Sequence, residues 1–171
     1  MPQKVYNNVV GQKLIDNGRT VEDITSVSLP TVEFPTSTIS SNGMAADVDV
    51  PNMAHVSAME FGVSHNNGHN CQYLNDPGKH SFELRVARQK YNVAVGDMDF
   101  ESMKVRVIGL LKNDEKGAIE TNNPYTGTNK YSVLRYEEEI DGKVITLIDA
   151  MTGQIVVNGK SMTDKVESLL N

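Results

Sequence analysis

Four residues near the middle of the sequence have side chains that commonly bind zinc: His65, His69, Cys71 and His80. Two zinc ligands on one helix must lie on the same face of that helix, but Gly68 interrupts this segment. The spacing therefore matches no zinc motif that has a defined mechanism. We expect these residues to form a polar loop at an interface, with no metal ion and no cofactor.

Three consecutive carboxylates, Glu137, Glu138 and Glu139, could also suggest acid–base catalysis. In an extended strand, successive side chains point to opposite faces, so Glu138 points away from its two neighbours. The three carboxylates therefore do not converge on one substrate atom. A strand with a solvated face explains them better than a catalytic site does.

No other motif in the sequence indicates an enzyme. The Asn-Gly and Asp-Gly pairs lack the glycine-rich context between a strand and a helix that a phosphate-binding loop requires. No Gly-x-Ser-x-Gly segment could form a nucleophile elbow. The single cysteine, Cys71, is expected to be a buried or interface thiol. We predict that the protein is not an enzyme.

The composition is that of one ordinary globular domain. The chain has 171 residues and a formal net charge of −6, without a run of Lys and Arg that would indicate nucleic-acid binding. One cysteine excludes a framework of intrachain disulfides. No apolar stretch approaches the roughly 20 residues of a membrane span, and the first residues lack the apolar segment of a signal peptide.

Strand-like alternation of apolar and polar residues dominates the sequence. We predict a mainly β fold, an antiparallel β-sandwich or partly open barrel, with one or two short helices. Short helices are expected over residues 68–75 and after Ser161, where Ser161 and Asp164 have the spacing of a capping box. The predicted strands cover residues 11–16, 20–29, 55–64, 81–91, 99–111, 131–140, 143–150 and 154–158.

Short turns should join several of these strands. Asn17-Gly18 is a strong two-residue hairpin signal, Asn158-Gly159 is expected to be a turn, and Asp141-Gly142 favours a type I′ hairpin. The turn at Asp141-Gly142 predicts the cross-strand pairs Ile140–Lys143, Glu138–Ile145 and Tyr136–Leu147. Longer loops are expected at about residues 40–53 and 112–129, and an N-terminal arm at about residues 1–10.

Several segments, taken in order, resemble a known family. The stretch from Tyr136 to Asp149, followed by Val157-Asn158-Gly159, resembles the C-terminal part of phage major tail tube proteins from contractile tails. Upstream, the strand ending in Leu29-Pro30, the Gly43-Met44 loop and the Met59-Glu60-Phe61 strand follow in the expected order. The resemblance extends from about Val9 to Asn158.

The resemblance implies a single domain of the tail-tube fold over residues 1–171. It implies a structural subunit whose hexameric rings stack into the inner tube of a contractile tail, which is driven through the target cell envelope when the sheath contracts. The expected partners are other copies of the chain, the sheath, the baseplate and the tape-measure protein, with DNA passing without sequence-specific binding. The particle would be a phage tail or a contractile bacteriocin, made in the cytoplasm of a bacterial host.

The resemblance also suggests which residues have which role. Alternation places one set of charged residues on the polar sides of the strands, and these are the candidates for the lumen: Glu83, Arg85, Lys104, Arg106, Arg135, Glu137 and Glu139. A lumen with mixed or negative charge would let DNA slide. The candidates for contacts between rings are Val5, Tyr6, Gly43, Met44, Asp47 and Asp49.

Other functions remain open from the sequence. The tube protein of a type VI secretion system would share the fold and the ring. A monomeric β-barrel that binds a small ligand would need an apolar pocket, and the low aromatic content and lack of Trp argue weakly against one. A metallohydrolase would require bound zinc at His65 and His69.

Overall fold

The computed structural model describes residues 4–66 and 69–171, without the side chains of residues 7, 69 and 70. The predicted fold class, mainly antiparallel β, is confirmed. The elements are β1 (Lys4–Asp16), β2 (Arg19–Thr20), β3 (Ile24–Ser28), β4 (Thr36–Ile39), β5 (Val48–Pro51), β6 (Glu60–Asn66), the 3₁₀ helix η1 (His69–Asn75), β7 (Lys79–Asn92), β8 (Asp97–Glu115), β9 (Thr126–Ile140), β10 (Lys143–Asp149), β11 (Gln154–Val157), β12 (Lys160–Ser161) and α1 (Asp164–Leu170).

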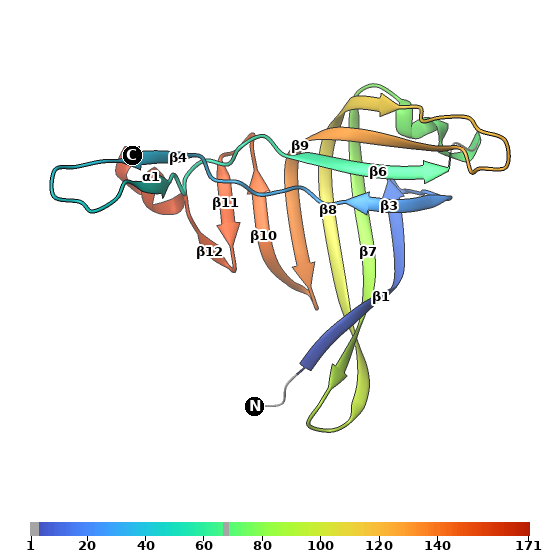
Figure 1. Ribbon diagram of the computed structural model, residues 1–171, viewed down its shortest axis with the longest axis horizontal. Coiled ribbons are helices and arrows are strands. Elements are labelled where there is room, and N and C mark those ends of the chain that lie inside the picture. The colour runs from blue at the N-terminus through green and yellow to red at the C-terminus, as the bar shows by residue number, and fades with distance from the viewer. Residues whose placement is uncertain (1–3, 67–68) are drawn as a thin grey trace.

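One antiparallel sheet contains nearly all of the strands. Its main path runs β12-β11-β10-β9-β8-β7-β1-β2, and β6 pairs with β9 while β3 pairs with β6. Strands β4 and β5 form a separate two-stranded ribbon away from this sheet (Figure 1). No helix among the described residues is long and apolar enough to cross a membrane.

Strand β9 gives the sheet its bend, because it has two different partners along the same edge. Residues 126–132 pair with β6, whereas residues 135–140 pair with β10. The other edge of β9 pairs with β8 along most of its length. Strands β3 and β6 therefore lie across the long strands β7, β8 and β9 (Figure 1). The sheet folds over itself without closing into a complete barrel.

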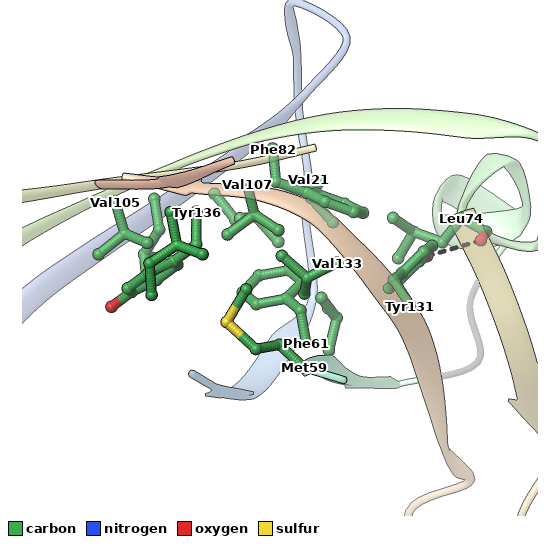
Figure 2. Packing of buried hydrophobic residues seen from close by; sticks show 14 of the residues in the cluster. Val21, Met59, Phe61, Leu74, Phe82, Val105, Val107, Tyr131, Val133 and Tyr136 are labelled. Carbon is green, nitrogen blue, oxygen red and sulfur yellow. Dashed lines mark hydrogen bonds between the residues drawn. The ribbon is translucent and has the colours of Figure 1, made fainter. Parts of the chain in front are cut away.

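The core fills this bend. Phe61 of β6, Phe82 of β7 and Tyr131 of β9 are fully buried, with Phe61 and Phe82 ring centroids 5.1 Å apart and Phe82 and Tyr131 centroids 4.7 Å apart. Val105 and Val107 of β8 pack into the same cluster (Figure 2). Burying aromatic rings from three strands favours this one arrangement of the bent sheet.

Polar side chains hold η1 against the sheet. The hydroxyl of Tyr131 donates to the Leu74 carbonyl over 2.7 Å (Figure 2), and Asn129 Nδ2 donates to the same carbonyl over 3.2 Å. His65 Nε2 in turn donates to Asn129 Oδ1 over 2.7 Å. Because these groups are buried, each needs a partner, and together they fix the position of the helix.

The three predicted turns all have the backbone of a type I′ turn, the type predicted at Asp141-Gly142. Both central residues have positive φ in each turn: 48° and 83° at Asn17-Gly18, 46° and 80° at Asp141-Gly142, and 52° and 73° at Asn158-Gly159. Asn and Asp tolerate this conformation better than most residues, and Gly adopts it freely. The turn chemistry read from the sequence is therefore confirmed.

The predicted register after the Asp141-Gly142 turn is wrong beyond the first pair. Ile140 pairs with Lys143, but a bulge at Ile145 makes Glu138 pair with Thr146 and Tyr136 pair with Ile148. The bulge turns Ile148 into the core and Leu147 to the same face as Glu137. Burial of the larger apolar surface overrides the register that the turn alone would set.

Some segments expected to be loops or continuous strands differ in the structure. From Lys4 onward the expected N-terminal arm is part of β1, which pairs with β7 as far as Lys4 and Asn92. The predicted strand 20–29 is divided, because Asp23 has a φ of 58° and β3 then pairs with β6. The strand expected over 55–64 begins at Glu60. The expected loops shorten to residues 40–47 and 116–125.

The C-terminal helix α1 forms after Ser161 as predicted, but the predicted capping box is wrong, because the N-cap residue is Thr163. Ser161 Oγ accepts a hydrogen bond from the Asp164 N–H over 3.2 Å, outside the helix. The helix also does not pack as expected. A helix this short should need to dock on the protein, yet none of its residues is buried. Its apolar side chains remain exposed.

Truncating Phe61 should measure how strongly the fold depends on the bend. We expect Phe61→Ala to lower the free energy of unfolding by about 3–5 kcal/mol, because it leaves a cavity among fully packed rings. Phe100→Ala is the matched control, since Phe100 is 62% exposed, and it should change stability by less than about 0.5 kcal/mol. Urea denaturation of both variants measures the two losses of stability. Equal losses for Phe61→Ala and Phe100→Ala would contradict the importance of the buried ring.

Candidate assembly surface

The outer face of the long strands is charged, and the structure places all seven predicted lumen candidates on it. Cross-strand partners share a face. Glu83, Arg106 and Glu137 form one row across β7, β8 and β9, and Arg85, Lys104 and Glu139 form the next. Arg135 lies on the same face, opposite Asp149 of β10. Residues that sequence alternation assigned strand by strand therefore meet on one continuous surface, which we call the charged face.

Arg106 lies at the centre of an ion-pair network on the charged face. It contacts the carboxylates of Glu137, of Glu139 at 3.4 Å and of Glu83 at 3.7 Å. Arg85 Nε donates to Glu83 over 2.5 Å. Glu83 lies on β7, and Glu137 and Glu139 lie on β9, so the network links three adjacent strands.

Two members of the charged face were not identified from the sequence. Lys13 of β1 pairs with Arg85 in the register, and Asp149 of β10 lies 3.8 Å from the Arg135 guanidinium. Alternation alone within β1 and β10 could not show which strands would be their neighbours. The cations of the face are Lys13, Arg85, Lys104, Arg106 and Arg135, and the carboxylates are Glu83, Glu137, Glu139 and Asp149. Charge on this face is therefore mixed, although the whole chain has a net charge of −6.

The polarity of both faces reverses where β1, β7 and β8 extend beyond the body. We call this part, residues 4–10 with residues 88–101, the extension (Figure 1). On its outer face Val5, Tyr91 and Met98 are cross-strand partners, and Phe100 lies beside them. These four side chains form an apolar patch with exposures of 46%, 37%, 49% and 62% in that order.

The inner face of the extension carries charges that satisfy one another. Glu101 is buried and contacts the Arg88 guanidinium and the Tyr6 hydroxyl, the latter at 3.3 Å. Buried Lys90 lies 3.4 Å from Asp99. This face therefore contains two ion pairs, although Arg88 Nε is buried without a hydrogen-bond partner among the described residues.

The structure does not bring the predicted inter-ring residues together within one chain. Val5 and Tyr6 lie on opposite faces of β1 in the extension. Gly43, Met44 and Asp47 lie in the loop of the β4–β5 ribbon, and Asp49 lies on β5. The ribbon and the extension occupy separate ends of the molecule (Figure 1), so the two groups can only meet between copies.

The predicted zinc-type residues have other partners. His65 binds Asn129, and the Cys71 thiol donates to the Glu22 carbonyl over 3.0 Å. His80 Nδ1 lies 2.8 Å from Asp16 Oδ2, and its Nε2 donates to the Asp76 carbonyl over 2.8 Å. The His69 side chain lies outside the described residues. Within the described part of the chain, no group of three such side chains could hold a metal ion.

The sheet has free edges at its ends. Strand β1 pairs with β2 only at Ile15 and Asp16, so among the described residues most of its outer edge has no partner strand. At the opposite end, β12 contributes only Lys160 and Ser161. Register shifts interrupt β1 near residues 7 and 10, which leaves residues 11–16 as its regular portion. Unpaired edges of this kind favour pairing with another chain.

Comparison with known proteins identifies the same architecture. The family model described as phage tail tube protein FII matches residues 11–170. A chain in the sheath/tube terminator of the extracellular contractile injection system PVC, in the extended state, superposes with a TM-score of 0.54 at 10% identity, covering 78% of this chain and 96% of that chain. A chain in the PVC sheath–tube complex, in the extended state, superposes with a TM-score of 0.52 at 10% identity, covering 75% of this chain and 87% of that chain. No curated protein matches the sequence.

The ion pairs of the charged face should give a small, pH-dependent stabilisation. The hydrogen bond from Arg85 lowers the pKa of Glu83, despite partial desolvation that raises it. Since the folded state binds this proton less tightly, the stabilisation is present above the ordinary Glu pKa and is lost as pH falls through the lowered value. The free energy of unfolding of the wild type should exceed that of Glu83→Gln by about 0.2–1 kcal/mol at pH 7. At acidic pH, where Glu83 is protonated, the two values should be equal. Urea denaturation at each pH measures these values, with Glu167→Gln on the exposed helix α1 as the control. A stability difference between wild type and Glu83→Gln that does not change with pH would contradict the assigned ion pair.

Proposed function

The chain belongs to the phage tail tube protein FII family, and we propose that it forms hexameric rings that stack into the inner tube of a contractile tail. The observation that carries the proposal is the family match, which spans residues 11–170. The resemblance read from the sequence is therefore confirmed at the level of the family. Because this family is structural, the prediction that the protein is not an enzyme is also confirmed.

The free edges of the sheet support ring formation. A rotation that brings the β1 edge of one copy to the opposite sheet edge of the next would cover both edges. A head-to-tail contact of this kind closes into a ring when the rotation divides a full turn. The joined sheets would then line a channel as a barrel does, without leaving an edge exposed.

The charged face is the proposed lining of the lumen. The seven candidates identified from the sequence lie on this one face, together with Lys13 and Asp149. Most of the cations already contact carboxylates of the same chain. A surface whose charges neutralise one another attracts phosphate weakly, so DNA would pass along it without sequence-specific binding.

The remaining partners follow from the proposed tube. The two PVC structures are described as assemblies of sheath and tube, and we propose that the outside of this tube likewise contacts a sheath whose contraction drives it through a cell envelope. A baseplate and a tape-measure protein would start the tube and set its length. The particle would be a phage tail or a tail-like bacteriocin assembled in the bacterial cytoplasm.

The residues predicted from the sequence for ring stacking remain part of the proposal. Val5 and Tyr6 lie at one end of the molecule, and the ribbon loop with Gly43 and Met44 lies at another. Neither group is buried in its own chain. Stacked rings would bring such separate exposed segments of successive copies into contact.

Electron microscopy of the purified protein tests the tube directly. We expect hollow six-fold rings or tubes at high protein concentration, and a mass in solution that rises in multiples of the subunit. If the protein remains a monomer at every concentration, addition of baseplates should still recruit it. A monomer that baseplates do not recruit would refute the proposal.

Selective labelling tests which face lines the lumen. In assembled tubes, Arg135→Cys should react with a small maleimide but poorly with a maleimide on a large polyethylene glycol, since the polymer is too bulky for the channel. Ile119→Cys is the control, because Ile119 is 82% exposed in the loop between β8 and β9, and both reagents should modify it. Buried Cys71 should contribute little background. Equal reaction of Arg135→Cys with the two reagents would place this face outside.

A further inference from the structure

We infer that the groove between the charged face and the apolar patch binds helix α1 of a second copy of this chain. The inference rests on the proposed self-assembly and names the two surfaces that meet. It concerns a contact between unlike surfaces, since the groove and α1 lie far apart on one molecule (Figure 1).

The groove has a floor of small residues. Gly11, Ala87 and Ser102 are neighbours across β1, β7 and β8 on the outer face. A Cβ added at Gly11 would have no atom within 4 Å, so this strand leaves open space above it. The groove has a volume of about 360 Å³; Val86 and Met103 also border it, but their side chains point to the inner face and pack against the core. Such a site can accept bulky aliphatic side chains.

The two sides of the groove differ in chemistry. One side is a cross-strand row of three cations, Lys13, Arg85 and Lys104, which ends in the carboxylate of Glu139 on β9. Like charges placed opposite one another repel, and among the described residues neither Lys13 nor Lys104 has a carboxylate within ion-pair distance. On the other side lies the row of Asn8, Gln89 and Phe100, and beyond it the rest of the apolar patch. The groove therefore suits a segment that is apolar along one face and acidic beside it.

Helix α1 has this pattern. Val166, Leu169 and Leu170 recur at helical spacing and form one apolar face, with Glu167 beside Leu170. Leu169 is 86% exposed and Leu170 is 81% exposed. A helix of this length has little stability without packing, yet it buries no residue in its own chain. It is therefore a segment that still needs a docking surface.

The match favours a copy of the chain over a nucleic acid. Phosphates would satisfy the cations but would leave the groove floor and the apolar patch uncovered. An amphipathic helix satisfies both, with leucines on the apolar surface and Glu167 toward the cations. Contact between two unlike patches of identical chains extends without limit when its rotation does not close a ring, which suits stacking of successive rings. The groove lies at the end of the charged face, where a neighbouring ring would begin.

Cross-linking between two singly substituted chains tests this contact. One chain carries Met98→Cys in the patch, the other carries Leu169→Cys in α1, and the two differ in mass through a tag. On mild oxidation of assembled mixtures, we expect a disulfide between the unlike chains and little within either kind. Buried Cys71 provides a low background. Disulfides only between two Met98→Cys chains would overturn the inference, because the patches would then face each other.

A charge exchange tests the electrostatic part. Lys13→Glu should reduce assembly about tenfold, since it places like charges opposite Glu167, and the double variant Lys13→Glu with Glu167→Lys should restore it. Lys143→Glu, at the exposed Asp141-Gly142 turn, makes the same change in net charge and should have little effect. Thermal unfolding of each monomer excludes a loss of fold as the cause.

The results separate this inference from the proposed function. Wild-type tubes that form without the Met98–Leu169 disulfide, and that tolerate Leu169→Ser, would overturn the groove contact and leave the tube in place. Wild-type protein that never associates, even with baseplates, would overturn both. Disulfides between Met98→Cys and Leu169→Cys chains, together with restored assembly of the Lys13→Glu, Glu167→Lys double variant, would support both the groove contact and the tube.

Discussion

The bent sheet depends on the sharing of one edge of β9 between two partner strands. Since a strand edge can pair with only one neighbour at a time, β6 and β10 must divide its length between them. The division forces β6 away from the plane of β10 and creates the space that Phe61, Phe82 and Tyr131 fill. The same geometry leaves the opposite face of β7, β8 and β9 uncovered. The core and the charged face are therefore two consequences of one pairing constraint.

Alternation along the strands converts this geometry into a surface for assembly. Within the body, inward positions are apolar and outward positions carry ion pairs, and the relation reverses in the extension. A monomer gains nothing from turning Phe100 and Met98 outward, because contiguous exposed apolar surface is unfavourable in water. The reversal is understandable if other copies cover the apolar patch. The chain is then built for assembly more than for stability alone.

The sequence contained enough information for the fold class, the turns and seven of the nine charged residues of the charged face, all except Lys13 and Asp149. Those features follow from local rules, since positive φ at Asp141-Gly142 and alternation along β8 need only neighbouring residues. The bulge at Ile145, the second partner of β9 and the reversal in the extension could not be predicted in this way. Each depends on which distant strand lies alongside, and pairing between strands far apart is fixed by the complete core.

The order of strands also has a consequence for biosynthesis. The C-terminal strands from β7 to β12 follow one another as adjacent hairpins, whereas β1 has to find β7, with Asp16 opposite Phe82 and Lys4 opposite Asn92. Closing such a long loop is slow relative to forming a hairpin. During translation the N-terminal strands leave the ribosome first, but their partners emerge much later. The nascent chain therefore exposes unpaired Val- and Ile-containing segments for much of its synthesis, a condition that favours aggregation.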